Sequence, residues 1–374
     1  MTLVKYKLGE LLIQHDKRNS DNLFHNVKGI SVRKEFREPT SKVNRNELTN
    51  YKLVYPNQFG SIQTTHNEKC FAFAYNNTNE VILISSVNLV FSVANENILL
   101  PRWLQLYFSR PEFDRYARFH SWGSAREIFS WNDICDVEIE LPPIEIQQKY
   151  VDIYDEMILN QQSYERGLED LKLVCDAYIE NLRRQTPCGE IEPYIERHDV
   201  RNGENGTKNV MGVSTSKEFR EPTSKVNKNE LANYKVVKPH QISFVQTTHN
   251  EKVFCNALND TDKDIVVTSV NEVFSTNEEK LLPEYLVMFF NRSEFDRYAR
   301  FHSWGSARET FTWEDLVKVE IPIVDVSIQK SIVDIYKVYK ERKDINNKLK
   351  AQIKNICPIL IKGSLEEGRK TKEA

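Results

Sequence analysis

The sequence predicts a mixed α/β (α+β) fold in which one domain occurs twice, with two long helices. Three observations support this prediction: a repeat over almost the whole chain, β-rich runs followed by amphipathic segments within each copy, and a helical stretch after each copy. The copies span roughly residues 8–145 and 191–327. We expect the helices to pair as an antiparallel coiled coil, with the copies related by a pseudo-twofold axis.

The repeat consists of identical polar blocks between apolar segments that have diverged. Core positions tolerate volume-conserving changes, so drift in the apolar segments is expected. The retained polar blocks indicate that both copies touch the same kind of ligand, although a recent duplication or gene conversion would also keep them identical. The blocks are EFDRYARFHSWGSARE at 112–127 and 294–309, KEFREPTSKVN at 34–44 and 217–227, and QTTHNEK at 63–69 and 246–252.

Each copy is expected to begin with short strands and to end with helix and strand. The β-rich runs 51–56, 71–75 and 81–86 are separated by turn residues. Residues 99–119 have the apolar spacing of an amphipathic helix, and 131–142 is expected to form a helical turn and then a strand.

The segments after the copies carry apolar residues at heptad spacing, which is typical of coiled-coil helices. A helix of 35 residues is about 52 Å long, so a paired helix could hold two domains apart by a DNA turn of roughly 34–36 Å. Polar seam residues would fix the register. Alternatively, each helix packs only on its own domain. The seams are Tyr150, Tyr154, Met157, Gln161, Tyr164, Leu168, Leu171, Cys175, Tyr178 and Leu182, and Ile328, Ile332, Ile335, Tyr339, Arg342, Asn346, Leu349, Ile353, Ile356 and Leu360.

These segments give five predicted regions. They are a first domain at 1–145, a spacer helix at 146–186, a second domain at 187–327, a second spacer helix at 328–362 and a flexible tail at 363–374.

The composition is globular and indicates a reducing cytoplasm. Of 374 residues, 40% are hydrophobic and 28% are charged, and the cysteines are scattered without metal or disulfide spacing. The N-terminus lacks a signal-peptide core, and no apolar run approaches the roughly 20 residues that span a bilayer. The net charge of −3 does not exclude nucleic-acid binding, because local patches matter more than the sum.

Several motifs follow a glycine in each copy. In the first copy Gly123 and Arg126 precede Leu141–Pro143 and then Gln147 or Gln148. The second copy keeps Gly305, Arg308 and Gln329 but has IPIVDVSIQ where the first has LPPIEIQQ. With the duplicated layout, these motifs resemble the specificity (S) subunits of type I restriction–modification systems over essentially the whole chain.

The resemblance implies a function and a set of partners. Each copy would be a target recognition domain that reads one half of a split double-stranded DNA site, and the helices would set the unread gap. Two methyltransferase subunits would dock on the helices and carry the adenine methylation, and restriction subunits could join. The chain itself would have no catalytic residue and no metal or cofactor, because S-adenosylmethionine, ATP and magnesium would be bound by the partners.

One departure from the family pattern affects a turn. YKLVYPNQF at 51–59 and YKVVKPHQI at 234–242 resemble the strand and turn that open the recognition domain. The usual glycine of that turn is replaced by Asn57 and His240. The departure leaves the geometry of this loop open.

Cations that meet phosphates and polar side chains that read base edges gather in the repeated blocks. A charged run is also typical of a solvated face, FDRYARF could be an amphipathic helix with Phe113, Tyr116 and Phe119 packed inward, and Arg126 could be a structural clamp. The candidate DNA-binding residues are Lys34, Arg37, Lys42, Gln63, Thr64, Thr65, His66, Asn67, Lys69, Arg118, His120, Trp122 and Arg126, and in the second copy Lys217, Arg220, Lys225, Gln246, Thr247, Thr248, His249, Asn250, Lys252, Arg300, His302, Trp304 and Arg308.

Identical readers related by a twofold axis predict an interrupted palindrome as the target. Enzyme classes are less well supported, since the chain has no phosphate-binding GxxxxGK[ST] loop, no Asn/Asp-Pro-Pro-Tyr motif and no G-x-S-x-G. His66 and His249 lack neighbours that would complete a metal triad. Three alternatives stay open: a specificity subunit for a type IIB-like nuclease–methyltransferase, a stand-alone enzyme with an unrecognised site, and a duplicated protein scaffold that never reads DNA.

Overall fold

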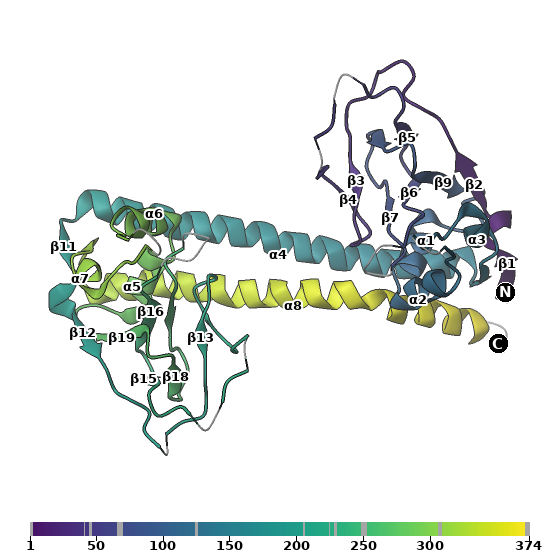
Figure 1. The fold of residues 1–374 in the computed structure, drawn as a ribbon. Coiled ribbons are helices and arrows are strands. Elements are labelled where there is room, and N and C mark those ends of the chain that lie inside the picture. The colour runs from purple at the N-terminus through teal and green to yellow at the C-terminus, as the bar shows by residue number, and fades with distance from the viewer. Residues whose placement is uncertain are drawn as a thin grey trace. The chain divides into compact units, whose positions relative to one another are not determined.

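The computed structural model describes residues 3–40, 42–44, 47–65, 70–123, 126–204, 206–223, 225–227, 230–247, 253–305 and 309–370 (Figure 1). The chain forms two compact units. Unit 1 comprises Met1–Ser163 and Asn346–Ala374, and unit 2 comprises Tyr164–Ile345. Each unit therefore contains one copy of the repeated domain and a part of both long helices. The predicted α+β class with duplicated domains and long helices is confirmed.

The first domain and the first long helix account for one series of elements. They are β1 (Val4–Lys7), η1 (Leu8–Glu10), β2 (Leu12–His15), β3 (Gly29–Ile30), β4 (Phe36–Arg37), β5 (Lys52–Val54), β6 (Phe59–Ser61), β7 (Phe73–Tyr75), β8 (Ile82–Ile84), β9 (Leu89–Val93), α1 (Pro101–Phe108), α2 (Pro111–Phe119), α3 (Trp131–Cys135), β10 (Glu138–Leu141) and α4 (Ile144–Gln185).

The second domain repeats this series element for element and ends in the second long helix. The elements are β11 (Cys188–Glu190), η2 (Glu192–Tyr194), β12 (Ile195–His198), β13 (Gly212–Val213), β14 (Phe219–Arg220), β15 (Lys235–Val237), β16 (Ile242–Val245), β17 (Asn256–Leu258), β18 (Ile265–Val267), β19 (Asn271–Thr276), α5 (Pro283–Phe290), α6 (Ser293–Phe301), α7 (Trp313–Leu316), β20 (Glu320–Pro322) and α8 (Val326–Lys370).

An antiparallel four-stranded sheet lies at the centre of each domain, in the order β2-β9-β6-β7 or β12-β19-β16-β17. Two-stranded ladders add β1-β10, β3-β4 and β5-β8, with the matching pairs in domain 2. The first domain's core is aromatic, with Phe71 stacked on Phe73 and edge-on to Phe108 and Phe113. This core buries one face of α1 and α2.

The predicted helix over 99–119 is two helices in the structure. Proline at 111 lacks an N–H and disfavours a helical conformation at the preceding residue, so α1 ends at Phe108 and α2 begins at Pro111. Domain 2 has Ser293 at the same place and keeps the break between α5 and α6. Packing of the two helices on the sheet therefore maintains the break without the proline.

A fully buried glutamine fixes the start of each long helix. In unit 1 the Gln147 Oε1 accepts from the Leu100 N–H at 2.9 Å, and its Nε2 donates to the carbonyl oxygens of Ile98 and Pro142. In unit 2 Gln329 makes the same three bonds, to Leu282, Lys280 and Val324. Gln147, rather than Gln148, is thus the counterpart of Gln329.

The long helices run antiparallel within each unit. In unit 1, Lys149 of α4 pairs with Glu367 of α8 at 2.9 Å, and the buried Gln161 donates to the buried Asn346 at 3.0 Å. These two polar seam residues face each other, as the heptad pattern predicts. Arg342, the third polar seam residue, is exposed and passes beside Gly167 of α4 in unit 2.

Two details of the helices differ from the prediction. Tyr178 is exposed, and Ile179 is buried in its place, because this end of α4 packs against the core of domain 2 instead of continuing a regular heptad seam. Of residues 363–374, predicted as a flexible tail, 363–370 belong to α8, and 371–374 lie outside the described residues. They are helical because Ser364 is buried and accepts from the Trp103 indole N–H at 3.3 Å.

The turn with an unusual residue in place of glycine is left-handed in both domains. Asn57 and His240 both have φ of +64°. Asparagine tolerates this conformation well, and histidine is also enriched there. His240 is further held by a 3.0 Å contact from its Nδ1 to Glu278.

Candidate nucleic-acid interface

Two of the identical blocks lie side by side in each domain. The Phe129 N–H donates to the Gln63 carbonyl at 2.8 Å, and the Thr65 N–H donates to that of Glu127 at 3.0 Å. Trp122 and Ile128 exchange two backbone bonds of 3.1 and 2.9 Å. Residues 63–65, 119–123 and 126–129 therefore form one surface, here called the recognition edge of domain 1. Residues 246–247, 301–305 and 309–311 form the same edge in domain 2, with the Phe311 N–H donating to the Gln246 carbonyl at 2.8 Å.

The glycine of the repeated SWG motif is required by the turn in this edge. Gly123 has φ of +137°, where a side chain is strained, and a Cβ there would lie 2.3 Å from the Arg126 carbonyl oxygen. Gly305 has φ of +136°. The motif resembling the family's Gly-x-x-Arg thus encodes a tight reversal that presents the residues on either side of it.

Large aromatic side chains are exposed on this edge. Phe119 is 80% and Trp122 is 73% exposed, and Phe301 and Trp304 are 82% and 74% exposed. The amphipathic alternative for FDRYARF holds for Phe113, which is buried, but is wrong for Phe119. Exposed aromatic groups repeated at the same place in two domains mark a surface for a partner.

Polar and cationic groups surround these rings. His120 packs its ring against Tyr116 at 4.2 Å, and His302 packs on Tyr298 at 4.3 Å. Arg118 is half-buried and Arg126 is exposed. Arg300 is exposed and lies 4.0 Å from Glu309. The exposed residues Arg37, Lys42, Arg220 and Lys225 lie on or just after the β3–β4 and β13–β14 hairpins.

Two predicted phosphate contacts are buried structural groups instead. The Lys34 Nζ donates to the Phe108 carbonyl at 2.7 Å and pairs with Asp114 at 2.9 Å, and its side chain is only 11% exposed. Lys217 makes the same bonds to Phe290 and Asp296, and burial lowers its pKa. Both ammonium groups are occupied, so neither can neutralise a phosphate.

The partner carboxylate explains why two separate blocks are identical in both copies. Asp114 also accepts from the Phe71 backbone N–H at 3.0 Å, and Asp296 accepts from that of Phe254 at 2.9 Å. One aspartate thus ties helix α2 or α6 to the segment just before β7 or β17 and to the lysine of the KEFREPTSKVN block. Sequence reasoning missed this role, although a buried lysine facing an aspartate from another identical block was a possible signal.

The QTTHNEK block is only partly a free surface. Thr65 is buried and its hydroxyl donates to the Glu127 carbonyl at 3.3 Å. Gln63, Thr64, Gln246 and Thr247 are half-buried along the edge. The other candidates, His66, Asn67, Lys69, Thr248, His249, Asn250, Lys252 and Arg308, lie outside the described residues.

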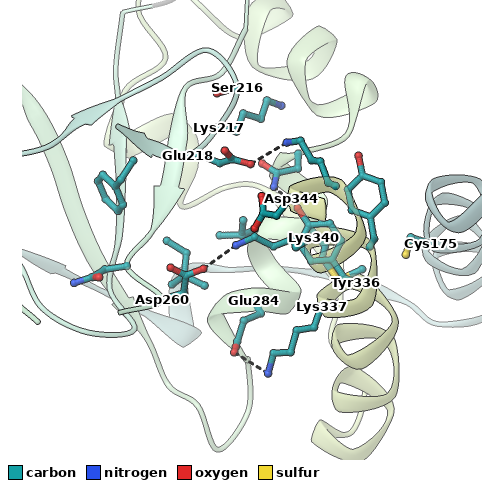
Figure 2. Close-up of a pocket in the computed structure, with 18 of the residues that line it drawn as sticks. Cys175, Ser216, Lys217, Glu218, Asp260, Glu284, Tyr336, Lys337, Lys340 and Asp344 are labelled. Atoms are coloured by element: carbon teal, nitrogen blue, oxygen red, sulfur yellow. Dashed lines mark hydrogen bonds and ion pairs between the residues drawn. The ribbon is translucent and has the colours of Figure 1, made fainter. Parts of the chain in front are cut away.

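A cavity of about 500 Å³ in unit 2 separates the second domain from its helices. Lysines of α8 bridge it to three parts of the domain: Lys337 to Glu284 at 3.5 Å, Lys340 to Asp260 at 2.8 Å, and Lys343 to Glu218 at 2.9 Å (Figure 2). These cations are engaged by carboxylates of the domain. The cavity is therefore a joint between domain and helix, distinct from the recognition edge.

Comparison with known protein families decides what these domains are. Residues 189–355 match the family described as the type I restriction modification DNA specificity domain. This range covers most of domain 2 and much of α8, and domain 1 repeats domain 2 element by element. The matched region is therefore a type I restriction modification DNA specificity domain. Its function is DNA sequence specificity, and neither the stand-alone enzyme nor the protein scaffold is favoured.

Solved structures support the fold of the whole chain. The type I restriction–modification S subunit from M. genitalium is 10% identical with a TM-score of 0.58, over 97% of this chain and 96% of that one. A chain from a structure of the assembly and conformational transition of a type I R-M system is 12% identical with a TM-score of 0.50, over 96% and 97%. No curated protein sequence matches this chain.

In the part of the chain that the structure describes, no helix is both long and apolar enough to cross a bilayer.

Proposed function

We propose that each domain reads one half of a bipartite DNA target through its recognition edge. The observation that carries this proposal is the recurrence of the same exposed aromatic and cationic edge in both domains of a specificity subunit. Bipartite sites match duplicated readers because each reader meets its own half-site. Identical edges make an interrupted palindrome the expected target.

The side chains of the edge divide into two roles. Arg118, Arg126 and Arg300 contact phosphates and fix the position of the domain on the duplex. Gln63 and Gln246 read base edges, since an amide carries both a donor and an acceptor. Phe119 and Trp122 meet apolar surface such as a thymine methyl group or an opened base step.

The long helices serve the assembly in this proposal. They set the number of unread base pairs and dock two methyltransferase subunits, with restriction subunits able to join. The specificity subunit is not catalytic, so S-adenosylmethionine, ATP and magnesium are bound by the partners. One structural relative comes from a structure of type I R-M complex assembly, which supports partner binding of this kind. The cytoplasm, where such partners meet DNA, is the proposed compartment.

DNA binding by the complex with the methyltransferase subunit tests the role of the edge. Trp122→Ala and Trp304→Ala should each weaken binding to the cognate site about tenfold, since an aromatic contact with a base is worth roughly 1–3 kcal/mol. Leu23→Ala is the matched control, because Leu23 is 70% exposed but lies between β2 and β3, outside the recognition edge and the long helices. Affinity is measured against salt concentration to separate phosphate contacts from base contacts.

Two results would contradict this role. Equal affinity of the tryptophan variants and the Leu23 control would remove the recognition edge from the interface. Binding that does not change with salt would remove phosphate contacts altogether.

A further inference from the structure

The glutamine side chains of the two recognition edges, Gln63 and Gln246, have different hydrogen-bond partners. In domain 2 the Gln246 Nε2 donates to Glu272 Oε1 at 2.6 Å. Glu272 lies on β19, is only 4% exposed, and accepts from Arg197 through bonds of 2.8 and 2.9 Å. Lys235 adds a contact of 3.5 Å to its other oxygen. A buried carboxylate held by two cations therefore restrains the Gln246 amide.

Domain 1 has no such carboxylate at the equivalent place. Leu89 stands where domain 2 has Glu272, and Gln14 stands where it has Arg197, both 183 positions earlier. Leu89 is buried in the apolar core. The Gln63 Nε2 instead donates to the neutral Val87 carbonyl at 3.4 Å, near the limit for a hydrogen bond.

The chemistry of the two partners makes the restraints unequal. A carboxylate only accepts hydrogen bonds, so the Gln246 amide must keep its Nε2 toward Glu272. Turning the amide over would set Oε1 against a buried negative charge. Charge-assisted bonds are roughly twice as strong as neutral ones, and the bond of Gln63 is both neutral and long. Gln63 can therefore turn its amide to suit a base at little cost.

We propose that Glu272 is a positioning residue that makes domain 2 the stricter of the two readers. It acts through Gln246, which presents one fixed order of donor and acceptor to its base pair. Gln63 presents either order, and so accepts more than one base at the equivalent position. This inference rests on the proposed function, in which the recognition edges read DNA.

If the two domains differ in stringency, substitutions in one half and in both halves of a palindromic target should have unequal effects. The complex can bind such a site in either orientation, so a site substituted in one half is bound with domain 1 on the substituted half. A second substitution, in the other half, must then face domain 2. The second substitution therefore costs more than the first. Two equal readers would instead lose the same factor at each step, since separate mismatches act roughly additively in free energy.

Methylation rates of the specificity–methyltransferase complex test this. The substrates are duplexes substituted at each recognised position in one half-site or in both. For the wild-type complex there should be one position at which the first substitution lowers the methylation rate only slightly and the second lowers it about tenfold or more. At that position Glu272→Gln should make both substitutions mild, because an amide at 272 can meet either end of Gln246.

Transplanting the network into domain 1 is the second variant. Gln14→Arg with Leu89→Glu rebuilds the restraint beside Lys52, which already occupies the position of Lys235 and is buried. The inference predicts that singly substituted sites then lose about tenfold in rate as well. Thermal unfolding of each variant shows whether the domain remains folded.

The outcomes separate this inference from the proposed function. A wild-type complex with no split methylation target would refute the proposed function itself. A split target with equal losses for the first and second substitutions at every position would overturn the inference alone. Unequal losses that survive Glu272→Gln would also overturn it. If the two halves of the target differ, only the half read by domain 2 should lose stringency in Glu272→Gln.

Discussion

The two domains share their recognition edge but are held to their helices by opposite charges. In unit 1, Arg102 of α1 donates from Nε to Asp155 of α4 at 2.9 Å. At the equivalent positions of unit 2, 182 residues later, Glu284 of α5 pairs with Lys337 of α8 at 3.5 Å. Both partners have changed sign together. At this joint the chain has kept the attraction and not the residues.

The comparison teaches which residues a duplicated domain must keep. The Lys34–Asp114 pair is identical in domain 2 because its geometry, including two backbone partners, is fully specified inside the domain. A half-exposed ion pair on a helix needs only complementary charges. Identity of sequence therefore marks two different constraints here, an internal junction and the recognition edge, and the structure separates them.

The largest expected effect comes from breaking the internal junction. Asp114→Asn should destabilise unit 1 by about 3–5 kcal/mol, because it leaves the buried Lys34 without its anion. Asp296→Asn should destabilise unit 2 by a similar amount. Chemical denaturation of the whole chain measures both losses of stability. Glu112→Gln is the control, because Glu112 is exposed and lies on the same helix, α2, as Asp114. A loss below 1 kcal/mol in either unit would show that the two junctions do not have the role assigned to them.

The buried glutamines should give the next largest effect. Gln147→Ala and Gln329→Ala each leave a buried N–H and two carbonyl groups without a partner, at a cost of about 2–4 kcal/mol. Gln148→Ala is the matched control, since Gln148 is exposed and bonds only to Asp152 among the contacts of the described residues. Melting temperatures give the comparison. Equal effects at 147 and 148 would contradict the structure of this turn.

The reversed ion pairs should give the smallest effect. Arg102→Glu places two carboxylates together and should cost about 1 kcal/mol or less, because the Asp155 side chain is 41% exposed. Adding Asp155→Lys should restore stability by copying the arrangement of unit 2. A double-mutant cycle measured by denaturation gives the coupling. Zero coupling would mean that the charge reversal is incidental.

The duplicated architecture could be predicted from the sequence because its signals are local. The repeated blocks predicted the two domains, and the heptad spacing predicted the paired helices with Gln161 and Asn346 on their seams, which the structure brings into contact. The repeated SWG motif also pointed to Trp122, which the structure shows exposed beside the tight turn at Gly123. These features depend on spacing and on conformational preference along the chain.

The errors come from contacts between distant segments. Nothing near Lys34 in the sequence shows that Asp114 would bury it, and nothing near Tyr178 shows that Ile179 would face the core of domain 2. The difference between Gln63 and Gln246 was hidden in the same way. Both lie in identical blocks, and the residue that distinguishes them, Leu89 or Glu272, lies on a neighbouring strand. The pairing of strands in the folded domain decides which residue lies beside each glutamine.

The most direct test of the central claim is a map of DNA methylation. The chain is expressed together with its methyltransferase subunit in a host without adenine methylation, and modified adenines are located by long-read sequencing. We predict a motif split into two short halves of related sequence around a gap of fixed length. A contiguous motif, or a stable complex that adds no methylation, would contradict the claim that two recognition edges each read one half of a DNA site.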